Sequence, residues 1–218
     1  MPCELVENNG DRLRDLVLQQ AARWELPADV IEWIRQGCTW HNTLVDRIVS
    51  APNDDDPLAA DPLSAVAEPF AEWLIAGKPG LAELTAHRAV ETVDDVYPYA
   101  LRKVRILNGA HTALVAKALP LGIATVREAV EDERVGPWLR RLLFEEIVPT
   151  VADSVPEAEA FAHDALQRFA NPFLDHRLAD IALHHETKLQ TRLAPTCEEY
   201  RATFGRQPPL LSELLDSA

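Results

Sequence analysis

Apolar residues recur at helical spacing along most of the chain. In residues 11–24 they repeat every three to four positions, as on one face of an amphipathic helix: Leu13, Leu16, Val17, Ala21 and Trp24. A second helix is predicted from Pro27, which suits a first helical turn, to about Gln36, with Gly37 as its stop. The same spacing predicts further helices at about 125–132, 136–147, 156–169, 174–183, 198–204 and 210–215.

Two stretches between these helices carry a different pattern. Residues 65–75 fit a strand or a helix, and residues 90–96 alternate as in a short strand. Pro149 is expected to end the helix that precedes it. The chain has 8 glycines and little β-branched alternation, which favours helices. We therefore predict a mainly α fold, a multi-helical bundle with a possible small β-element near residues 65–96.

The central predicted helix starts at Tyr97 and ends before Pro120. Its apolar stripe consists of Leu101, Val104, Leu107, Leu114, Val115 and Ala118. Asn108 and His111 fall in the middle of that stripe, and Lys103 lies on its flank, roughly 80° from His111 on the helical wheel. A lysine, an amide and an imidazole can therefore converge on one face of this helix.

Two interpretations of these polar residues stay open. A buried amide or imidazole without a partner costs a few kcal/mol, so Asn108 and His111 must bond to nearby backbone or face a polar cavity. In the first case the helix is an ordinary core helix, loosened at Gly109, and the spacing alone favours this interpretation.

Composition excludes several classes of protein. The chain has 218 residues, enough for an independent core, and its formal net charge of −14 argues against a nucleic-acid partner, which requires clustered cations. No apolar run is long enough to span a bilayer, and Met1–Glu4 lacks the features of a signal peptide, so we expect a cytoplasmic protein without membrane contact. The three cysteines are expected to be reduced thiols: Cys3, Cys38 and Cys197.

Neither a nucleotide loop nor a metal site is indicated by the motifs. No two of the glycines have G-x-G spacing, so a dinucleotide-binding fingerprint and a P-loop are both absent. Residues 1–9 are typical of the exit from a strand, and we expect the chain to be part of something longer. The carboxylates of residues 54–56 are more typical of a solvated loop than of a metal site. We also expect no metal at three C-terminal histidines, His176, His184 and His185.

Four strings of the sequence, taken together, resemble one known family. They are Pro2-Cys3-Glu4-Leu5 through Asn9-Gly10, Asn42 through Ile48, Lys103 through His111, and Asn171-Pro172-Phe173. They resemble the C-terminal domain of the mannitol dehydrogenase family, the polyol-specific long-chain dehydrogenases, over essentially the entire chain. Within that family these sequence strings are most similar to those of the branch that interconverts tagaturonate and altronate.

The resemblance implies a fold and a function. The fold would be a helical substrate domain like the C-terminal domain of 6-phosphogluconate dehydrogenase. Residues 1–218 would form this single domain, and residues 1–9 would be the exit of an absent N-terminal Rossmann domain that binds NAD. The function would be that of an NAD-dependent oxidoreductase acting on a sugar acid. We expect such a chain to be inactive alone and to require a Rossmann domain, for which a partner chain is one source.

The resemblance also assigns roles to residues of the central helix. Lys103 resembles the family's catalytic general acid and base, and Asn108 and His111 resemble the pair that binds the reacting oxygen. These residue types suit the chemistry, because hydride transfer to a ketone leaves negative charge on its oxygen, which donors and an ammonium stabilise. Arg102 and Arg105 are candidates to lower the pKa of the lysine toward neutrality.

Further residues are implied to contact the substrate. Val45 and Asp46 match a family pair near the active site, and Lys188 resembles a substrate-contacting lysine. A sugar acid needs a cation for its carboxylate, which Lys188, Arg47 or Arg105 would supply. Leu5 replaces an asparagine of the mannitol-type members, which favours the uronate branch.

Three alternatives remain. The chain would act on fructuronate or on a mannitol-type polyol, it would be a non-enzymatic helical interaction module, or it would be a stand-alone metalloenzyme. The interaction module predicts exposed apolar surface and dimerisation through it. The metalloenzyme would use the acidic loop at 54–56 or the C-terminal histidines.

Overall fold

The computed structural model describes residues 1–52, 56–77 and 86–216. Its residues divide into two compact units. Unit 1 consists of residues 1–47 and 70–100, and unit 2 of residues 48–69 and 101–218. The sequence had led us to expect one domain over residues 1–218. The mainly helical class with a small β-element is confirmed.

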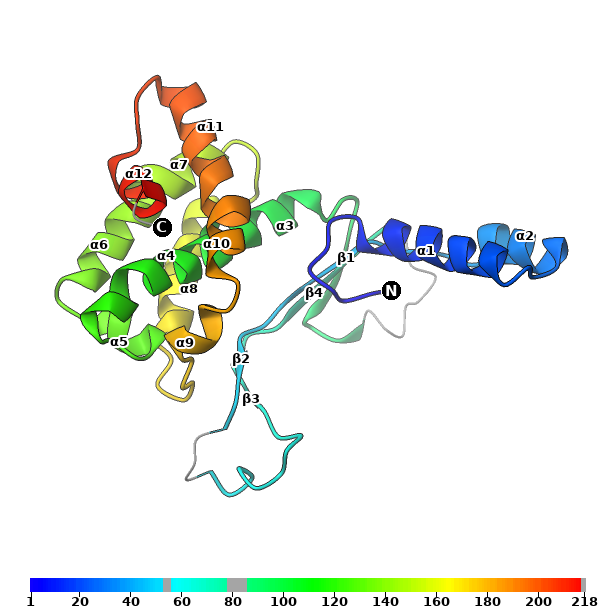
Figure 1. Ribbon diagram of the computed structural model, residues 1–218, viewed down its shortest axis with the longest axis horizontal. Coiled ribbons are helices and arrows are strands. Elements are labelled where there is room, and N and C mark those ends of the chain that lie inside the picture. Colours follow the sequence, from blue (N-terminus) through cyan, green and yellow to red (C-terminus); the bar gives the residue numbers. More distant parts are fainter. Residues whose placement is uncertain (53–55, 78–85, 217–218) are drawn as a thin grey trace. The chain divides into compact units, whose positions relative to one another are not determined.

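Unit 1 combines a helical hairpin with a small sheet (Figure 1). Its elements are α1 (Asn9–Arg23), α2 (Ala28–Gly37), β1 (Thr43–Asp46), β4 (Glu72–Ala76) and β5 (Val90–Val93). The strand order is β1-β4-β5, with β1 antiparallel to β4, and β4 parallel to β5. Leu44, Leu74 and Val96 form the buried apolar cluster of this unit. The predicted strand at 90–96 is confirmed as β5, whereas β1 was not predicted.

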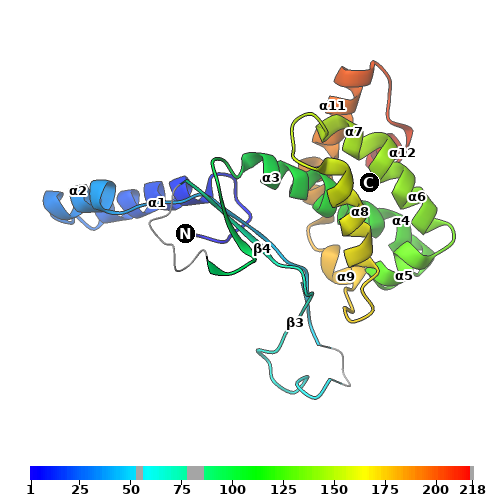
Figure 2. The same ribbon diagram turned by 180° about the vertical axis from the view of Figure 1, so that it is seen from behind.

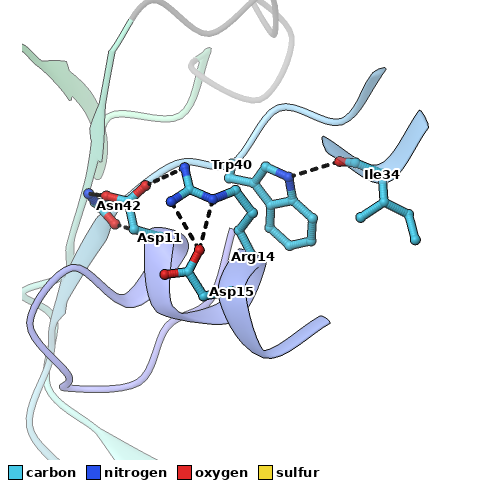
Figure 3. Close-up of polar contacts among 6 residues, drawn as sticks. All are labelled: Asp11, Arg14, Asp15, Ile34, Trp40 and Asn42. Carbon is cyan, nitrogen blue, oxygen red and sulfur yellow. Dashed lines mark hydrogen bonds and ion pairs between the residues drawn. The ribbon is translucent and has the colours of Figure 1, made fainter. Parts of the chain in front are cut away.

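The start of α1 is joined to β1 by a polar network. Asn9 donates from Nδ2 to the carbonyl of Thr43 at 2.9 Å and accepts the backbone N–H of Thr43 at 2.9 Å. Asn42 exchanges hydrogen bonds with Asp11, and Asp11 also pairs with Arg14 at 3.1 Å (Figure 3). The polar contacts therefore fix the orientation of α1 on the strand.

Gly10 marks the tightest approach in this network. A Cβ atom at residue 10 would lie 2.2 Å from the carbonyl oxygen of His41, which no side chain tolerates. Beside it, Trp40 closes the connection by donating from Nε1 to the carbonyl of Ile34 at 3.4 Å (Figure 3).

The apolar faces of α1 and α2 are largely exposed. Both predicted helices are confirmed, but none of the side chains of α2, all of them described, is buried. Trp24 is 69% exposed, Trp33 64% and Leu16 61%. The described residues of unit 1 therefore do not cover the apolar stripe that the sequence pattern predicted.

Unit 2 is a bundle of short helices gathered around the central helix (Figures 1 and 2). Its first part contains β2 (Val49–Ser50), β3 (Val66–Ala67), η2 (Lys103–Asn108), α4 (Gly109–Ala118), η3 (Leu119–Leu121), α5 (Val126–Glu131) and α6 (Val135–Arg141). It continues with η4 (Leu142–Ile147), α7 (Val148–Val151), α8 (Ala158–Phe169), α9 (Leu178–Ile181), α10 (His185–Lys188), η5 (Leu189–Leu193), α11 (Ala194–Phe204) and α12 (Pro209–Asp216). The boundary between the units falls inside α3 (Tyr97–Arg102).

The core of unit 2 comes mostly from the stripes that the sequence pattern identified, although Ile106, Leu189 and Leu193 lay outside them. Its fully buried large side chains are Ile106, Leu114, Leu139, Leu142, Leu143, Ile147, Leu178, Leu189, Leu193 and Leu211. Thr125 caps α5 in a reciprocal pair with Glu128, which is a local signal for the observed helix start.

The central helix is confirmed, but it is not regular. Residues 103–108 form a π-helix, η2, between the α-helical segments α3 and α4. Such wide turns are rare and occur frequently at functional sites. Gly109 has ordinary helical dihedrals, so it does not loosen the helix. A Cβ atom at residue 109 would lie 3.4 Å from Cδ2 of Leu193, about an ordinary van der Waals contact.

Several helix boundaries differ from the prediction. The helix predicted at 174–183 is limited to α9, and the one predicted at 198–204 begins earlier, at Ala194. Helix continues through Pro149 to Val151, because a proline in a first turn loses no hydrogen bond and here follows a π-helical segment. Residues 185–193 are helical although no helix was predicted there, since the polar run around His185 hides the apolar contacts of Leu189 and Leu193.

Glu146 joins two helices inside unit 2 and gives a testable expectation. Its buried carboxylate accepts the backbone N–H groups of Leu210 and Leu211 at 2.9 and 2.8 Å, at the start of α12. Glu146→Ala should lower the free energy of unfolding by about 2–3 kcal/mol, because two buried donors lose a charged acceptor. Urea unfolding measures this, with the exposed neighbour change Glu145→Ala as the control. Equal stability of the two variants would contradict the assigned role.

Two kinds of feature are absent from the described ranges. No helix within them is both long and apolar enough to cross a membrane. No group of three or more histidine, cysteine, aspartate or glutamate side chains in those ranges is arranged to hold a metal ion. Asp54 and Asp55 of the acidic loop lie outside the described residues.

Candidate active site

Two polar side chains of the central helix are buried without partners. Asn108 is 8% exposed and His111 is 6% exposed. Asn108 Nδ2 and His111 Nε2 have no hydrogen-bond partner among the described residues. The backbone of Asn108 does have one, because Thr112 Oγ1 donates to its carbonyl at 2.8 Å. Since an unpaired buried donor is costly, this arrangement favours the polar-cavity interpretation over that of a core helix.

The ring of His111 lies among aromatic and cationic groups. It packs against Phe169, with ring centroids 4.2 Å apart, and meets the edge of His176 at 4.9 Å. Burial, followed by the charges of four groups, holds the pKa of His111 well below its usual value of 6.5; the groups are His176, Arg168, Arg192 and Lys103. At neutral pH the imidazole is therefore uncharged, in a field that favours an anion.

A pocket of about 350 Å³ opens beside His111 within unit 2. Its lining residues are Val49, Ser50, Ala51, His111, His176, Asp180, Ile181, Lys188 and Arg192. Ser50 Oγ and His176 Nδ1 are also buried without a partner in the described part of the chain. Several donors and acceptors thus remain available to a polar ligand.

The wall formed by residues 49–51 is held by a buried ion pair. Arg168 on α8 donates to both carboxylate oxygens of Glu68, from Nη2 to Oε1 at 2.8 Å and from Nε to Oε2 at 3.0 Å. The same carboxylate accepts the backbone N–H of Ile48 at 2.6 Å. The side chain of Glu68 is 1% exposed and that of Arg168 is 8% exposed. This pair therefore fixes the ends of the β2–β3 segment against α8.

Two cations from successive helical turns line the same pocket. Lys188 at the end of α10 donates from Nζ to the carbonyl of Ile181 at 2.7 Å. Arg192 on η5 donates from Nη1 to Thr112 Oγ1 at 3.3 Å. Burial lowers the pKa of both side chains, and the charge of Arg192 lowers that of Lys188 further.

The structure places some of the predicted site residues at the pocket and others away from it. His111 and Lys188 line the pocket, and Lys103 is close enough for its charge to act on His111. Arg105 is directed toward α11, where it contacts Thr196 Oγ1 at 2.8 Å and Glu199 at 3.5 Å.

Three predicted residues belong to unit 1. Val45 and Asp46 lie on β1, and Arg47 follows it with an exposed side chain. Asp46 is 1% exposed. Their part in substrate binding stays a prediction.

Sequence reasoning assigned no binding role to four polar residues of the pocket: Ser50, His176, Asp180 and Arg192. Arg192 had a usable signal, because it lies four residues after Lys188 and shares its helical face. Ser50 and His176 had none, since tertiary contacts place both the short strand β2 and the connection before α9.

The histidine gives an expectation for the pH dependence of stability. Folding lowers the pKa of His111. Below about pH 6.5 its imidazole is therefore protonated in the unfolded chain but stays neutral in the folded chain. The free energy of unfolding should therefore fall as the pH decreases below about 6.5 and be constant above it with respect to this group. Unfolding in urea between pH 5 and 8 measures the slope, and His111→Gln should reduce it. An unchanged slope would contradict the assignment.

Comparison with known proteins identifies the family. The model of the mannitol dehydrogenase C-terminal domain matches residues 95–214, and that of the mannitol dehydrogenase Rossmann domain matches residues 1–85. We had expected the Rossmann part to end near residue 9. Of the strands inside this match, β1 was not predicted, whereas β4 overlaps the stretch 65–75 for which a strand or a helix was expected.

Similar proteins of known name include altronate oxidoreductases. Those of Yersinia pestis bv. Antiqua (strain Nepal516) and Bacillus subtilis (strain 168) are each 40% identical to this chain over 97% of its length. The chain spans about half the length of these relatives, 46% of each.

Solved structures show the same fold. The Pseudomonas fluorescens mannitol 2-dehydrogenase, in a ternary complex with NAD and D-mannitol, matches 98% of this chain with a TM-score of 0.74 and 23% identity. A D-sorbitol dehydrogenase in substrate-free form matches 97% with a TM-score of 0.81 and 24% identity. These matches cover 44% and 45% of the two solved chains. With a family model matching more than half of its length, the chain belongs to the mannitol dehydrogenase family.

Proposed function

We propose that this chain supplies the substrate-binding and proton-transfer part of an NAD-dependent oxidoreductase that interconverts tagaturonate and altronate. The observation that carries the proposal is the pair of buried, unpartnered donors Asn108 Nδ2 and His111 Nε2 on one helix, with His111 at a cation-lined pocket. The names of the relatives at 40% identity support the choice of substrate.

The residues suit the charge changes of the reaction. When a ketone accepts hydride, negative charge develops on its oxygen, and two preorganised neutral donors stabilise that charge. His111 is kept neutral by its lowered pKa, and its Nε2 is buried without a hydrogen-bond partner among the described residues. Lys103 would give a proton to the oxygen during reduction and take it back during oxidation.

The chain fits the substrate end of such a site but not the whole dinucleotide. No pair of its glycines has the spacing of a phosphate-binding loop. The pyrophosphate of NAD would therefore be held by Rossmann-domain residues outside residues 1–218. NAD, when bound, supplies or accepts the hydride. The polar donors of η2 and α4 would then face the carbon that exchanges it.

The roles of the other implied residues remain part of the proposal. Val45 and Asp46 would help to orient the substrate, as the family resemblance implies. Arg47 would contact the substrate from the end of β1. Arg105 would act more indirectly, because its guanidinium already pairs with Glu199.

The exposed apolar faces of α1 and α2 support a Rossmann-domain partner. These faces would pack against the rest of that domain, on this chain or a partner chain. The same exposure favours one alternative, a non-enzymatic interaction module that dimerises through these helices. Light scattering separates the two, because a monodisperse monomer would contradict the module. A cytoplasmic location stays a prediction.

Oxidation of NADH tests the proposal. The chain alone should not oxidise NADH with any keto acid, and it should do so with tagaturonate after fusion to the remaining N-terminal part of a relative such as the Bacillus subtilis enzyme. Fructuronate and fructose, tested in parallel, distinguish the uronate and mannitol branches. A folded fusion protein that binds NADH but reduces none of the three would refute the proposal.

A further inference from the structure

The pocket beside His111 is lined by more positively charged than negatively charged side chains. Lys188 and Arg192 both line it, one helical turn apart, and among the described residues that line it the acidic one is the exposed Asp180. Within the described residues, the single hydrogen bond of Arg192 goes to Thr112, so most of its guanidinium donors remain available. Two cations this close, half-buried and not paired with a carboxylate, indicate a site for an anion.

The position of Arg192 suits a ligand that also reaches His111. Thr112, which accepts the hydrogen bond of Arg192, is next to His111 on α4 and donates to the carbonyl of Asn108. The guanidinium is therefore anchored to the same helix that presents the two unpartnered donors. A planar guanidinium also matches the two oxygens of a carboxylate, whereas an ammonium acts as a point charge.

The other candidate cations are less suitable. Arg105 is already paired with Glu199 and contacts Thr196. Arg168 is bound to both oxygens of Glu68. Neither of these arginines lines the pocket.

We propose that Arg192, assisted by Lys188, binds the carboxylate of the sugar-acid substrate and so determines the preference for an acid over an uncharged polyol. This inference rests on the proposed function, since it names the residue that distinguishes the substrate class of the same site. It assigns a specificity role to a residue that the sequence resemblance did not include.

Equilibrium binding to the intact chain tests the inference without requiring turnover. D-Altronate and D-altritol, its uncharged alditol, are titrated by calorimetry into the wild-type chain and into Arg192→Met, Arg192→Lys and Arg140→Met. The last variant is the matched control, because Arg140 is an exposed arginine on α6. Circular dichroism verifies that each variant is folded.

The expected result is selective. The wild-type chain should bind altronate more tightly than altritol, and Arg192→Met should weaken altronate binding by about 10- to 100-fold, the usual effect of losing a charge-assisted hydrogen bond, while altritol binding is unchanged. Arg192→Lys should weaken altronate binding less than Arg192→Met does, and Arg140→Met should leave it unchanged. If Arg192→Met binds altronate as the wild type does, or loses both ligands equally, the inference is wrong while the proposed function stands. If the wild-type chain binds neither ligand, both are wrong.

Discussion

Replacing Lys103 by methionine should slow the reduction of tagaturonate by about 10²–10⁴-fold in the chain fused to the N-terminal part of the Bacillus subtilis relative, the range that general acid catalysis contributes. Methionine preserves the unbranched side chain but has no proton to give. Because Lys103 acts on the transition state, the loss should appear in kcat with little change in KM. Steady-state NADH oxidation measures both constants.

The control for this change lies on the same helix. Lys117→Met removes an ammonium from α4 that pairs with Glu213 on α12 and does not line the pocket. It should leave kcat unchanged. In the reduction direction the lysine must be protonated, so the rate falls on the alkaline side of the pH–rate profile. Loss of this alkaline limb in Lys103→Met alone would support proton transfer by this residue. A fully active Lys103→Met variant would exclude it.

Replacing Glu68 by alanine should lower the free energy of unfolding by about 3–5 kcal/mol, because it leaves the guanidinium of Arg168 buried without its carboxylate. The backbone N–H of Ile48 loses its acceptor in the same change. Since residues 49–51 line the pocket, binding of altronate should weaken as well. Urea unfolding measures the first effect and calorimetric titration the second.

Two controls separate the buried ion pair from ordinary surface charges. Glu145→Ala breaks an exposed pair with Arg141 and should cost at most about 1 kcal/mol. The double change of Glu68→Leu with Arg168→Met removes both charges and should recover much of the stability. A cost for Glu68→Ala no larger than that for Glu145→Ala would show that the pair does not hold the segment.

The helices were predictable because each carries a periodic apolar stripe, which is buried in most helices of unit 2 and largely exposed in α1 and α2. The capping pair of Thr125 and Glu128, and the buried leucines of unit 2, illustrate this. Residues 185–193 were not recognised, because their helix depends on contacts with α4 and α11 rather than on a local pattern. The π-helical form of η2 was equally unpredictable, since its residues fit an ordinary helix.

The candidate site was predictable only in part. Asn108 and His111 stood out because polar residues interrupt an apolar stripe, and that anomaly can be read from one helix. Arg192, His176 and Ser50 join the pocket through tertiary packing, which brings together η5, the connection before α9 and β2. The ion pair of Glu68 and Arg168 links residues 100 positions apart, a distance over which sequence spacing carries no information.

The most direct test of the account follows the imidazole of His111 while altronate is added to the intact chain. In a spectrum of the protein with nitrogen-labelled histidines, the account predicts a neutral His111 at pH 7 whose Nε2 resonance shifts saturably with altronate. The resonance of the remote His163 on α8, which packs against Phe144, should not move. A His111 resonance that stays unchanged at saturating altronate would contradict the claim that this donor holds the reacting oxygen.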